Sequence, residues 1–186
     1  MRVHAVLCRK NLRVMFQDEA RFGRINDPRA CWANKGVRPI AEKQIIREYT
    51  YAYGAFSPKD GQMDSLILPR MNAHCMGLFL REVGKRHPKE IILMVVDGAP
   101  CHSDKKGALL VPHNIELLHL PPYSPQLNPS ENMWDDMREK CFINRSFDSM
   151  DHLEDHLSSS LLHYENSPQI VPSISAWNWI IRNLSF

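Results

Sequence analysis

The sequence predicts an α/β domain in which helices flank a mixed β-sheet. A continuous apolar run at 91–96 is typical of a strand that is buried on both faces. The alternating aromatic segment 49–56 and the segment 62–68, joined by turn-forming residues at 57–61, predict a β-hairpin. Residues 72–86 place apolar side chains at helical spacing. Strands and helices in this order indicate a sheet covered by helices.

Length and composition favour one folded domain. The chain has 186 residues, of which 44% are hydrophobic and 24% charged, which is enough to bury one core and argues against disorder. The formal net charge is only +2, so a nucleic-acid surface would have to come from local clusters. The five cysteines are widely spaced and odd in number, which disfavours a disulfide framework or zinc site and indicates a reducing, cytoplasmic environment. We expect no membrane span, because no apolar run approaches ~20 residues.

The elements follow in order along the chain. We expect a basic lead-in at 1–12, a short strand at 13–18, and mostly loop at 20–43 with one short strand at 30–33. After the hairpin, Asn72 is the expected N-cap of the helix 72–86. The strand 91–96 is followed by a short helix at 103–110 and a strand at 115–120. Asn128 as N-cap and Pro129 at the first helical position predict a helix to about residue 141. Further helices are expected at 150–164 and 174–184.

Three acidic residues stand at notable places in this order. Asp18 ends the first predicted strand, Asp97 ends the most buried strand, and Glu131 lies in the first turn of a helix. Each has a purely structural explanation, because acids favour first helical turns and an Asp before Gly opens turns. If they converge, two carboxylates ~4 Å apart repel by ~4 kcal/mol at an effective dielectric of ~20. Either their pKa values rise or a divalent ion neutralises them, and carboxylate oxygens suit Mg²⁺ or Mn²⁺. Spacing alone does not show convergence.

The segment 120–134, LPPYSPQLNPSENMW, carries a specific resemblance. It resembles the third-acid motif of the mariner-related DDE transposases of bacterial insertion sequences: Tyr-Ser-Pro, Leu-Asn-Pro, then Glu, then Trp. The segment 16–22, FQDEARF, resembles the strand with the first Asp, and 95–102, VVDGAPCH, the strand with the second. The 33 residues between Asp97 and Glu131 are close to the spacing of this family.

This resemblance implies an RNase H-like fold, similar to that of retroviral integrases, with a five-stranded mixed sheet that gathers the three acids. It implies that Asp18, Asp97 and Glu131 are catalytic and bind Mg²⁺, with Mn²⁺ as a substitute, as a pair of ions. It also implies hydrolysis of a phosphodiester at transposon ends and strand transfer into target DNA, by a homodimer. The implied catalytic domain spans 13–145, preceded by the lead-in 1–12 and followed by a helical extension, 146–186, packed on it.

The chain departs from the family pattern in two ways. Gly98 stands where Asn usually follows the second Asp. Family members also carry N-terminal helix-turn-helix modules, whereas a dozen residues precede the first predicted strand here. The resemblance therefore implies a fragment, an excised domain or the product of a split or decayed element, in which recognition of transposon ends is in doubt.

Several residues near the acids have both a functional and a structural interpretation. His102 and Glu19 could support the metal ligands from behind, or could be an ordinary loop histidine and an exposed acid. Tyr123 could stack on an unpaired base or pack in its loop. Trp134, one helical turn from Glu131, is expected in the core, where it would orient the helix.

Basic residues gather in two stretches that could contact phosphates without reading bases, or could be a solvated charged face. They are Arg21, Arg24, Lys35, Arg38, Lys43 and Arg47, and then Arg138, Lys140 and Arg145.

Two other functions compete with metal-dependent polynucleotidyl transfer. A non-catalytic DNA-binding or assembly domain of a decayed element would need none of the acids, yet all three are present. A phosphohydrolase with an aspartate nucleophile generally has Asp-x-Asp at its strand end, and Asp18-Glu19-Ala20 does not supply it. No P-loop is present, so no nucleotide cofactor is expected.

Overall fold

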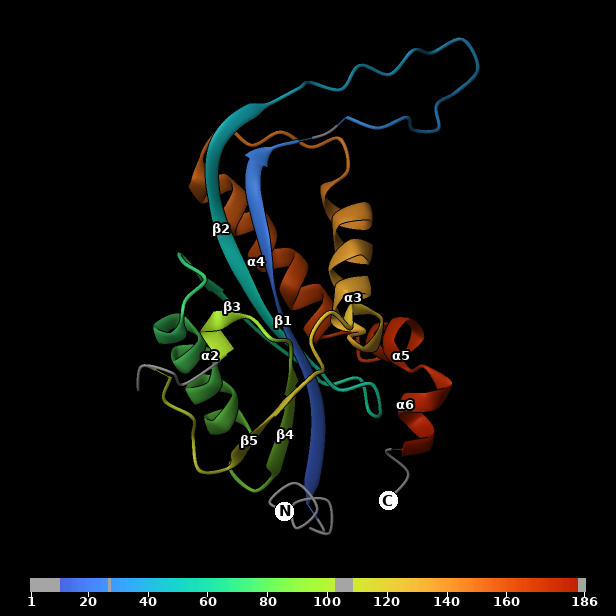
Figure 1. Ribbon diagram of the computed structural model, residues 1–186. Helices are drawn as coiled ribbons and strands as arrows, with labels where there is room; N and C mark the ends of the chain where they lie inside the picture. The colour runs from blue at the N-terminus through green and yellow to red at the C-terminus, as the bar shows by residue number, and fades with distance from the viewer. Residues whose placement is uncertain (1–10, 27, 103–108, 184–186) are drawn as a thin grey trace.

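A five-stranded mixed sheet forms the centre of the protein, as the computed structural model shows for residues 11–26, 28–102 and 109–183 (Figure 1). The strand order is β3-β2-β1-β4-β5. The first three strands pair antiparallel, β4 pairs parallel with β1, and β5 pairs parallel with β4. Their bounds are β1 (Leu12–Ile25), β2 (Ile45–Phe56), β3 (Met63–Leu68), β4 (Ile91–Val96) and β5 (Ile115–His119).

Helices cover both faces of the sheet. Helix α2 lies on one face, while α3 and α4 lie on the other, with α5 and α6 beyond them (Figure 1). The bounds are α2 (Ala73–Arg86), α3 (Ser130–Met137), α4 (Met150–Glu165), α5 (Ile170–Ser175) and α6 (Asn178–Asn183). Of the helices in the described ranges, none has the length and apolar character needed to cross a bilayer.

Alternation along β1 divides its side chains between the two faces. Met15 packs with Tyr53 and the α2 residues Phe79 and Leu80. Its neighbour Phe16 faces the other way and packs against Val95 and Ile180 of α6. Farther along β1, Ala20 and Phe22 face α3 and α4. Positions 16, 18, 20 and 22 therefore share the face that carries α3.

The prediction that the first strand ends at Asp18 is wrong. β1 continues to Ile25, so Asp18 lies in mid-strand, and no strand forms at 30–33. The polar residues after Asp18 resemble a strand end, but their backbone pairs with β2 to Gly23 opposite Tyr49 and, after a shift in register, to Ile25 opposite Ile45. An ion pair between Arg24 and Glu48, with 2.6 Å between nitrogen and oxygen, holds this distal part of the two strands together.

Most helix predictions are confirmed, with adjustments at the ends. Asn72 caps α2 by accepting the Cys75 N–H at 2.9 Å. Pro129, and not Asn128, is the N-cap of α3, while the Asn128 side chain accepts the Ser130 N–H at 3.1 Å. The single helix expected at 174–184 is two short helices, since the chain leaves helical geometry at Ala176. The apolar spacing continues across this break, so periodicity could not reveal it. The lead-in expected at 1–12 and the helix expected at 103–110 lie mostly outside the described residues.

Helix α3 is fixed to the sheet by Trp134, which is 2% exposed. Its indole makes edge-on contacts with Phe22 and Phe56, at 6.2 and 5.3 Å between ring centroids. It reaches the backbone at Gly54, where a Cβ would lie 2.8 Å from the indole and 2.7 Å from the Phe56 ring. Gly54 pairs with Asp18, so the indole packs beside the first candidate acid. The expected core role of Trp134 is confirmed.

We predict that Trp134→Ala lowers the free energy of unfolding by about 3–5 kcal/mol, because it removes a large buried side chain and leaves a cavity. Urea denaturation measures the change. Trp32→Ala is the matched control, since Trp32 is fully exposed and its loss should change stability by less than ~0.5 kcal/mol. Similar effects of the two substitutions would contradict this account of how α3 is held.

Candidate functional site

Parallel pairing of β1 with β4 brings the first two acids side by side. Phe16 of β1 pairs with Val95 of β4. Asp18 lies two residues after Phe16, and Asp97 lies two residues after Val95. Adjacent strands lie ~4.8 Å apart, and residues two apart share a face. Phe16 and Val95 pack into the same cluster on the α3 face, so Asp18 and Asp97 belong to that face too.

The third acid approaches from α3. The loop from Leu120 is tied to the end of β4, because the Leu120 N–H donates to the Val96 carbonyl at 2.8 Å. A 3₁₀ turn at Pro125–Leu127 then leads into α3, and Glu131 lies in its first turn. With Trp134 packed on the sheet one turn later, this arrangement holds Glu131 next to the strand ends.

Asp97 and Glu131 line one cavity of about 420 Å³. The 120–124 loop forms one wall, and Tyr123 at its tip is fully exposed with a backbone φ of 56°. Left-handed geometry in a tyrosine costs free energy and is concentrated at functional sites. The Tyr123 side chain is therefore exposed to solvent beside Asp97 and Glu131, and it does not pack within its loop. A Cβ at Gly98 would contact nothing within 4 Å, so this departure from the family pattern leaves the cavity wider.

The electrostatics show that Asp18 lies near both other acids. Burial raises the pKa of Asp18 most, and the negative charges of Glu19, Asp97 and Glu131 raise it further, to about 7. Among the described residues, no cationic side chain forms an ion pair with Asp18 or Glu131. The structure thus brings the three predicted acids together, and two of them, Asp18 and Glu131, have no cationic partner among the described residues.

His102 joins Asp97 to Glu19. Its Nδ1 lies 2.7 Å from Asp97 Oδ1, its Nε2 lies 3.0 Å from Glu19 Oε1, and the imidazole is fully buried. Burial opposes a charge on His102, but hydrogen bonds with Asp97, Cys101 and Glu19 outweigh it and raise its pKa to about 12. The resulting imidazolium donates to both carboxylates. Its hydrogen bond is the main cause that lowers the pKa of Asp97.

A second group of possible ligands lies behind the acids and fits a metal poorly. The Glu19 carboxylate, the Cys101 thiol and the His102 imidazole place ligand atoms within 4.8 Å of one another. An imidazolium donates from both nitrogens and has no lone pair for a metal ion. This group is better explained as a hydrogen-bonded support that orients Asp97. The oxygen-only set of Asp18, Asp97 and Glu131 fits a hard divalent ion.

Of the other residues that the sequence predicted for the site, one supports the acids and others lie away from them. Glu19, which could have been an exposed acid, has a side chain only 3% exposed and contacts His102. Arg138 lies at the far end of α3, away from the acid cavity, and lines a different one. Arg24 is occupied by Glu48 and by the Phe147 and Asp148 carbonyls. Sequence reasoning missed Gly54, although a glycine inside an aromatic strand signals close approach of another group.

The fold and the acid cluster define a class of protein before any relative is considered. A mixed sheet of five strands with acids on its two central strands and on a following helix is the RNase H-like arrangement of transposase and integrase catalytic domains. Residues 13–154 match the model of the family described as DDE superfamily endonuclease. The chain belongs to this family, as the motifs predicted. It is also 33% identical over 136 residues to the uncharacterized protein y4pE/y4sA of Sinorhizobium fredii (strain NBRC 101917 / NGR234), covering 73% of this chain and 99% of that protein.

Solved structures share the fold. The Mos1 transposase paired-end complex with left transposon end aligns with a TM-score of 0.60 at 19% identity, over 87% of this chain and 52% of that one. The catalytic domain of Mos1 mariner transposase aligns with a TM-score of 0.52 at 16% identity, over 88% of this chain and 79% of that one. Mos1 paired-end complexes with Mn and with Mg have the same fold. The chain thus spans about half the length of the transposase in these complexes. The predicted RNase H-like fold class is confirmed.

Metal-free protein should show the raised pKa of Asp18 as a pH-dependent loss of stability. Between about pH 4 and pH 7 the folded protein keeps a proton on Asp18 that the unfolded chain has released, so stability falls as pH rises through this window. We predict that, in chelator, Asp18→Asn becomes progressively more stable than wild type over this range, by up to about 4 kcal/mol. Urea denaturation across pH measures the difference.

Asp155→Asn is the control for this experiment, because Asp155 is exposed on α4 and should follow the wild-type curve. A constant difference between Asp18→Asn and wild type from pH 4 to pH 7 would show that the Asp18 pKa is ordinary.

Removing His102 should destabilise the protein, because it leaves the buried Glu19 carboxylate without its cation. We predict that His102→Ala costs about 3–5 kcal/mol, as for other broken buried pairs. The exposed His113 provides the control substitution, and thermal or urea unfolding provides the measurement. Equal stability of His102→Ala and His113→Ala would rule out the imidazolium bridge.

Proposed function

We propose that this chain is the catalytic domain of a transposase that hydrolyses a phosphodiester at transposon ends and joins the freed 3′ end to target DNA. The observation that carries the proposal is the cluster of Asp18, Asp97 and Glu131, of which Asp97 and Glu131 line one cavity. The pKa of Asp18 is raised mainly by burial, and further by the negative charges of Glu19, Asp97 and Glu131. Membership of the DDE superfamily endonucleases supports nuclease chemistry. Transposon-end complexes among the solved structures that share the fold support DNA as the partner.

The three carboxylates would hold divalent metal, with Mg²⁺ as the expected ion and Mn²⁺ as a substitute. Metal held there would supply positive charge that stabilises the oxygens of an in-line phosphoryl displacement, and we propose a pair of ions. Asp97 is prepared for this role, because His102 and the Ala99 N–H both bind its Oδ1. Its Oδ2 is therefore the oxygen available to a metal ion. Asp18 becomes fully ionised at neutral pH only when positive charge offsets its neighbours.

The remaining residues would orient the substrate. Trp134 and the proline-rich 120–125 loop would hold Glu131 beside the ends of the parallel strands. The exposed ring of Tyr123 stands at the cavity wall and would stack on a base unpaired next to the cut. We further propose that the active assembly is a homodimer, in which the rest of a transposase would supply recognition of the ends.

The proposal predicts a metal site that depends on the acids. Calorimetric titration should show that wild type binds Mn²⁺ and that Glu131→Gln weakens this binding by roughly 100-fold or more. Loss of a residue that only hydrogen-bonds to a metal ligand typically costs about 10–100-fold. Mn²⁺-dependent nicking of supercoiled plasmid should fall in parallel. Asp155→Asn keeps the same charge change on an exposed helix face and should retain both properties.

A non-catalytic assembly domain would give a different pattern. If Glu131→Gln bound Mn²⁺ as wild type does, Glu131 would not be a ligand. If wild type bound no divalent ion at all, the chain would be a DNA-binding remnant and not an enzyme.

A further inference from the structure

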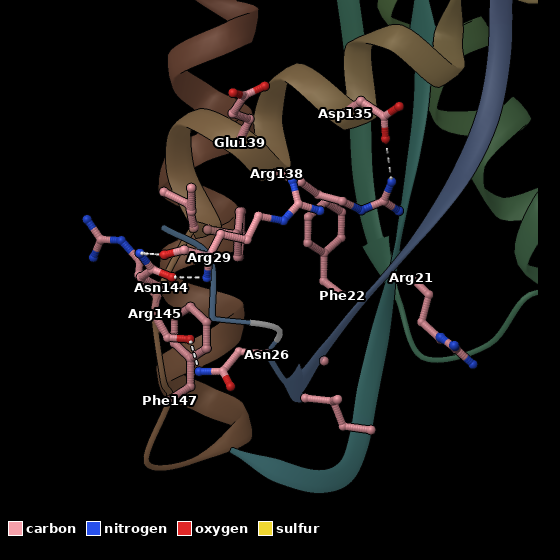
Figure 2. Close-up of a pocket in the computed structure, with 14 residues that line it drawn as sticks. Arg21, Phe22, Asn26, Arg29, Asp135, Arg138, Glu139, Asn144, Arg145 and Phe147 are labelled. Carbon is pink, nitrogen blue, oxygen red and sulfur yellow. Dashed lines mark hydrogen bonds and ion pairs between the residues drawn. The ribbon is translucent and has the colours of Figure 1, made fainter. Parts of the chain in front are cut away.

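A second cavity, also of about 420 Å³, lies at the far end of α3 from the acids (Figure 2). The distal part of β1, the end of α3 and the segment before α4 enclose it. Four arginines line it against two acids, Asp135 and Glu139, so its charge is positive. The arginines are Arg21, Arg29, Arg138 and Arg145. Its size is within the range of about 300–1,000 Å³ of small-ligand sites.

Two of these arginines converge. Figure 2 shows Arg29 and Arg138 reaching toward Phe22, whereas Arg21 and Arg145 point outward. The Arg138 guanidinium lies 5.5 Å from the centroid of the Phe22 ring and 3.3 Å from Asp135. Within the described part of the chain, no carboxylate pairs with Arg29 or Arg145. Converging guanidinium groups repel, so the cavity favours an anion.

The backbone at Arg29 is held in place by a strained residue. Asn144 has a φ of 55°, and its amide accepts the Arg29 N–H at 2.8 Å and donates to the Arg29 carbonyl at 3.0 Å. Asn26 similarly donates to the Arg145 carbonyl at 3.0 Å. These bonds join segments 115 or more residues apart in the sequence, so the fold unites the two basic stretches at one cavity.

The cavity lies farther along the same strand and helix that carry Asp18 and Glu131. α3 passes into a π-helix at Arg138–Phe142, a geometry frequent at functional sites. Glu131 and Arg138 are seven residues apart on this helix, a rise of ~10 Å. Asp18 and Phe22 are four residues apart on β1, or ~13 Å. Figure 1 shows α3 running alongside this half of β1, and the residues that line the two cavities lie toward opposite ends of α3.

We propose that the arginine cavity binds the phosphodiester backbone of the DNA strand whose scissile phosphate lies at the acids. This rests on the proposed function of the acid site. A strand of duplex carries a phosphate every ~3.4 Å along the axis, so the cavity would hold phosphates about three to four nucleotides from the cut. The planar guanidinium forks of Arg29 and Arg138 match phosphate geometry. Contacts of this kind fix the position of the strand and read no bases.

Salt dependence of DNA binding tests the proposal. Anisotropy of a short fluorescein-labelled DNA duplex, titrated in EDTA over a series of salt concentrations, gives the slope of log affinity against log salt. Each lost phosphate contact should reduce the slope by ~0.9, so Arg29→Ala with Arg138→Ala should reduce it by about 2, whatever the DNA sequence. Arg81→Ala with Lys85→Ala, two exposed cations on the opposite face, is the control and should change nothing.

A second variant tests the geometry without removing charge. Asn144→Gly keeps the left-handed backbone but loses the clamp on Arg29, so it should give part of the same loss. An unchanged slope in the arginine variant, or no measurable DNA binding by wild type, would overturn the proposal. EDTA separates metal binding at the acids from DNA binding at the arginine cavity. If the acids bound no metal, the DNA result in EDTA would still stand, and if the arginine cavity bound no DNA, the metal titration would still stand.

Discussion

The parallel pairing of β1 with β4 is the constraint on which the site depends. It aligns Phe16 with Val95, and so sets Asp18 and Asp97 beside each other although 79 positions separate them. A shift of one residue in this register would send Asp18 to the α2 face. The shift is costly, because Met15 and Phe16 fill different cores on the two faces. Hydrophobic packing thereby determines where the charges lie.

The acids on the two sides of β1 differ in whether a cation compensates their charge. On the α2 side, the buried Glu19 has its own cation in His102. On the α3 side, Asp18 and Glu131 have no cationic partner among the described residues, and burial together with neighbouring negative charges raises the pKa of Asp18. His102 connects the sides, since it also holds Asp97 Oδ1. The acids that would bind an ion thus lower the stability of the fold, whereas the ion pair of His102 with Glu19 behind them raises it. The arginine cavity continues this separation of charge, because it gathers positive groups at the far end of α3 from the acids.

The sequence revealed the elements with strong local signals and missed those that depend on long-range contacts. The apolar run of β4, the hairpin and the cap of α2 were predictable because each is encoded within a few residues. The motif around Glu131 indicated the family, and the resemblance of the three motifs implied the roles of the three acids. The distal half of β1 was not predictable, since pairing with β2 stabilises it. The role of Glu19 and the union of Arg29 with Arg138 arise from contacts across the fold, which no spacing rule encodes.

The central claim is that Asp18, Asp97 and Glu131 form one electrostatic unit that requires a divalent ion. Carboxyl-carbon NMR of the Asp18 side chain, titrated with pH in chelator and again with Mg²⁺, measures this most directly. The account predicts a pKa of about 7 without metal and a clear decrease when Mg²⁺ is present. A pKa near the ordinary value for aspartate without metal, or one that Mg²⁺ leaves unchanged, would contradict it.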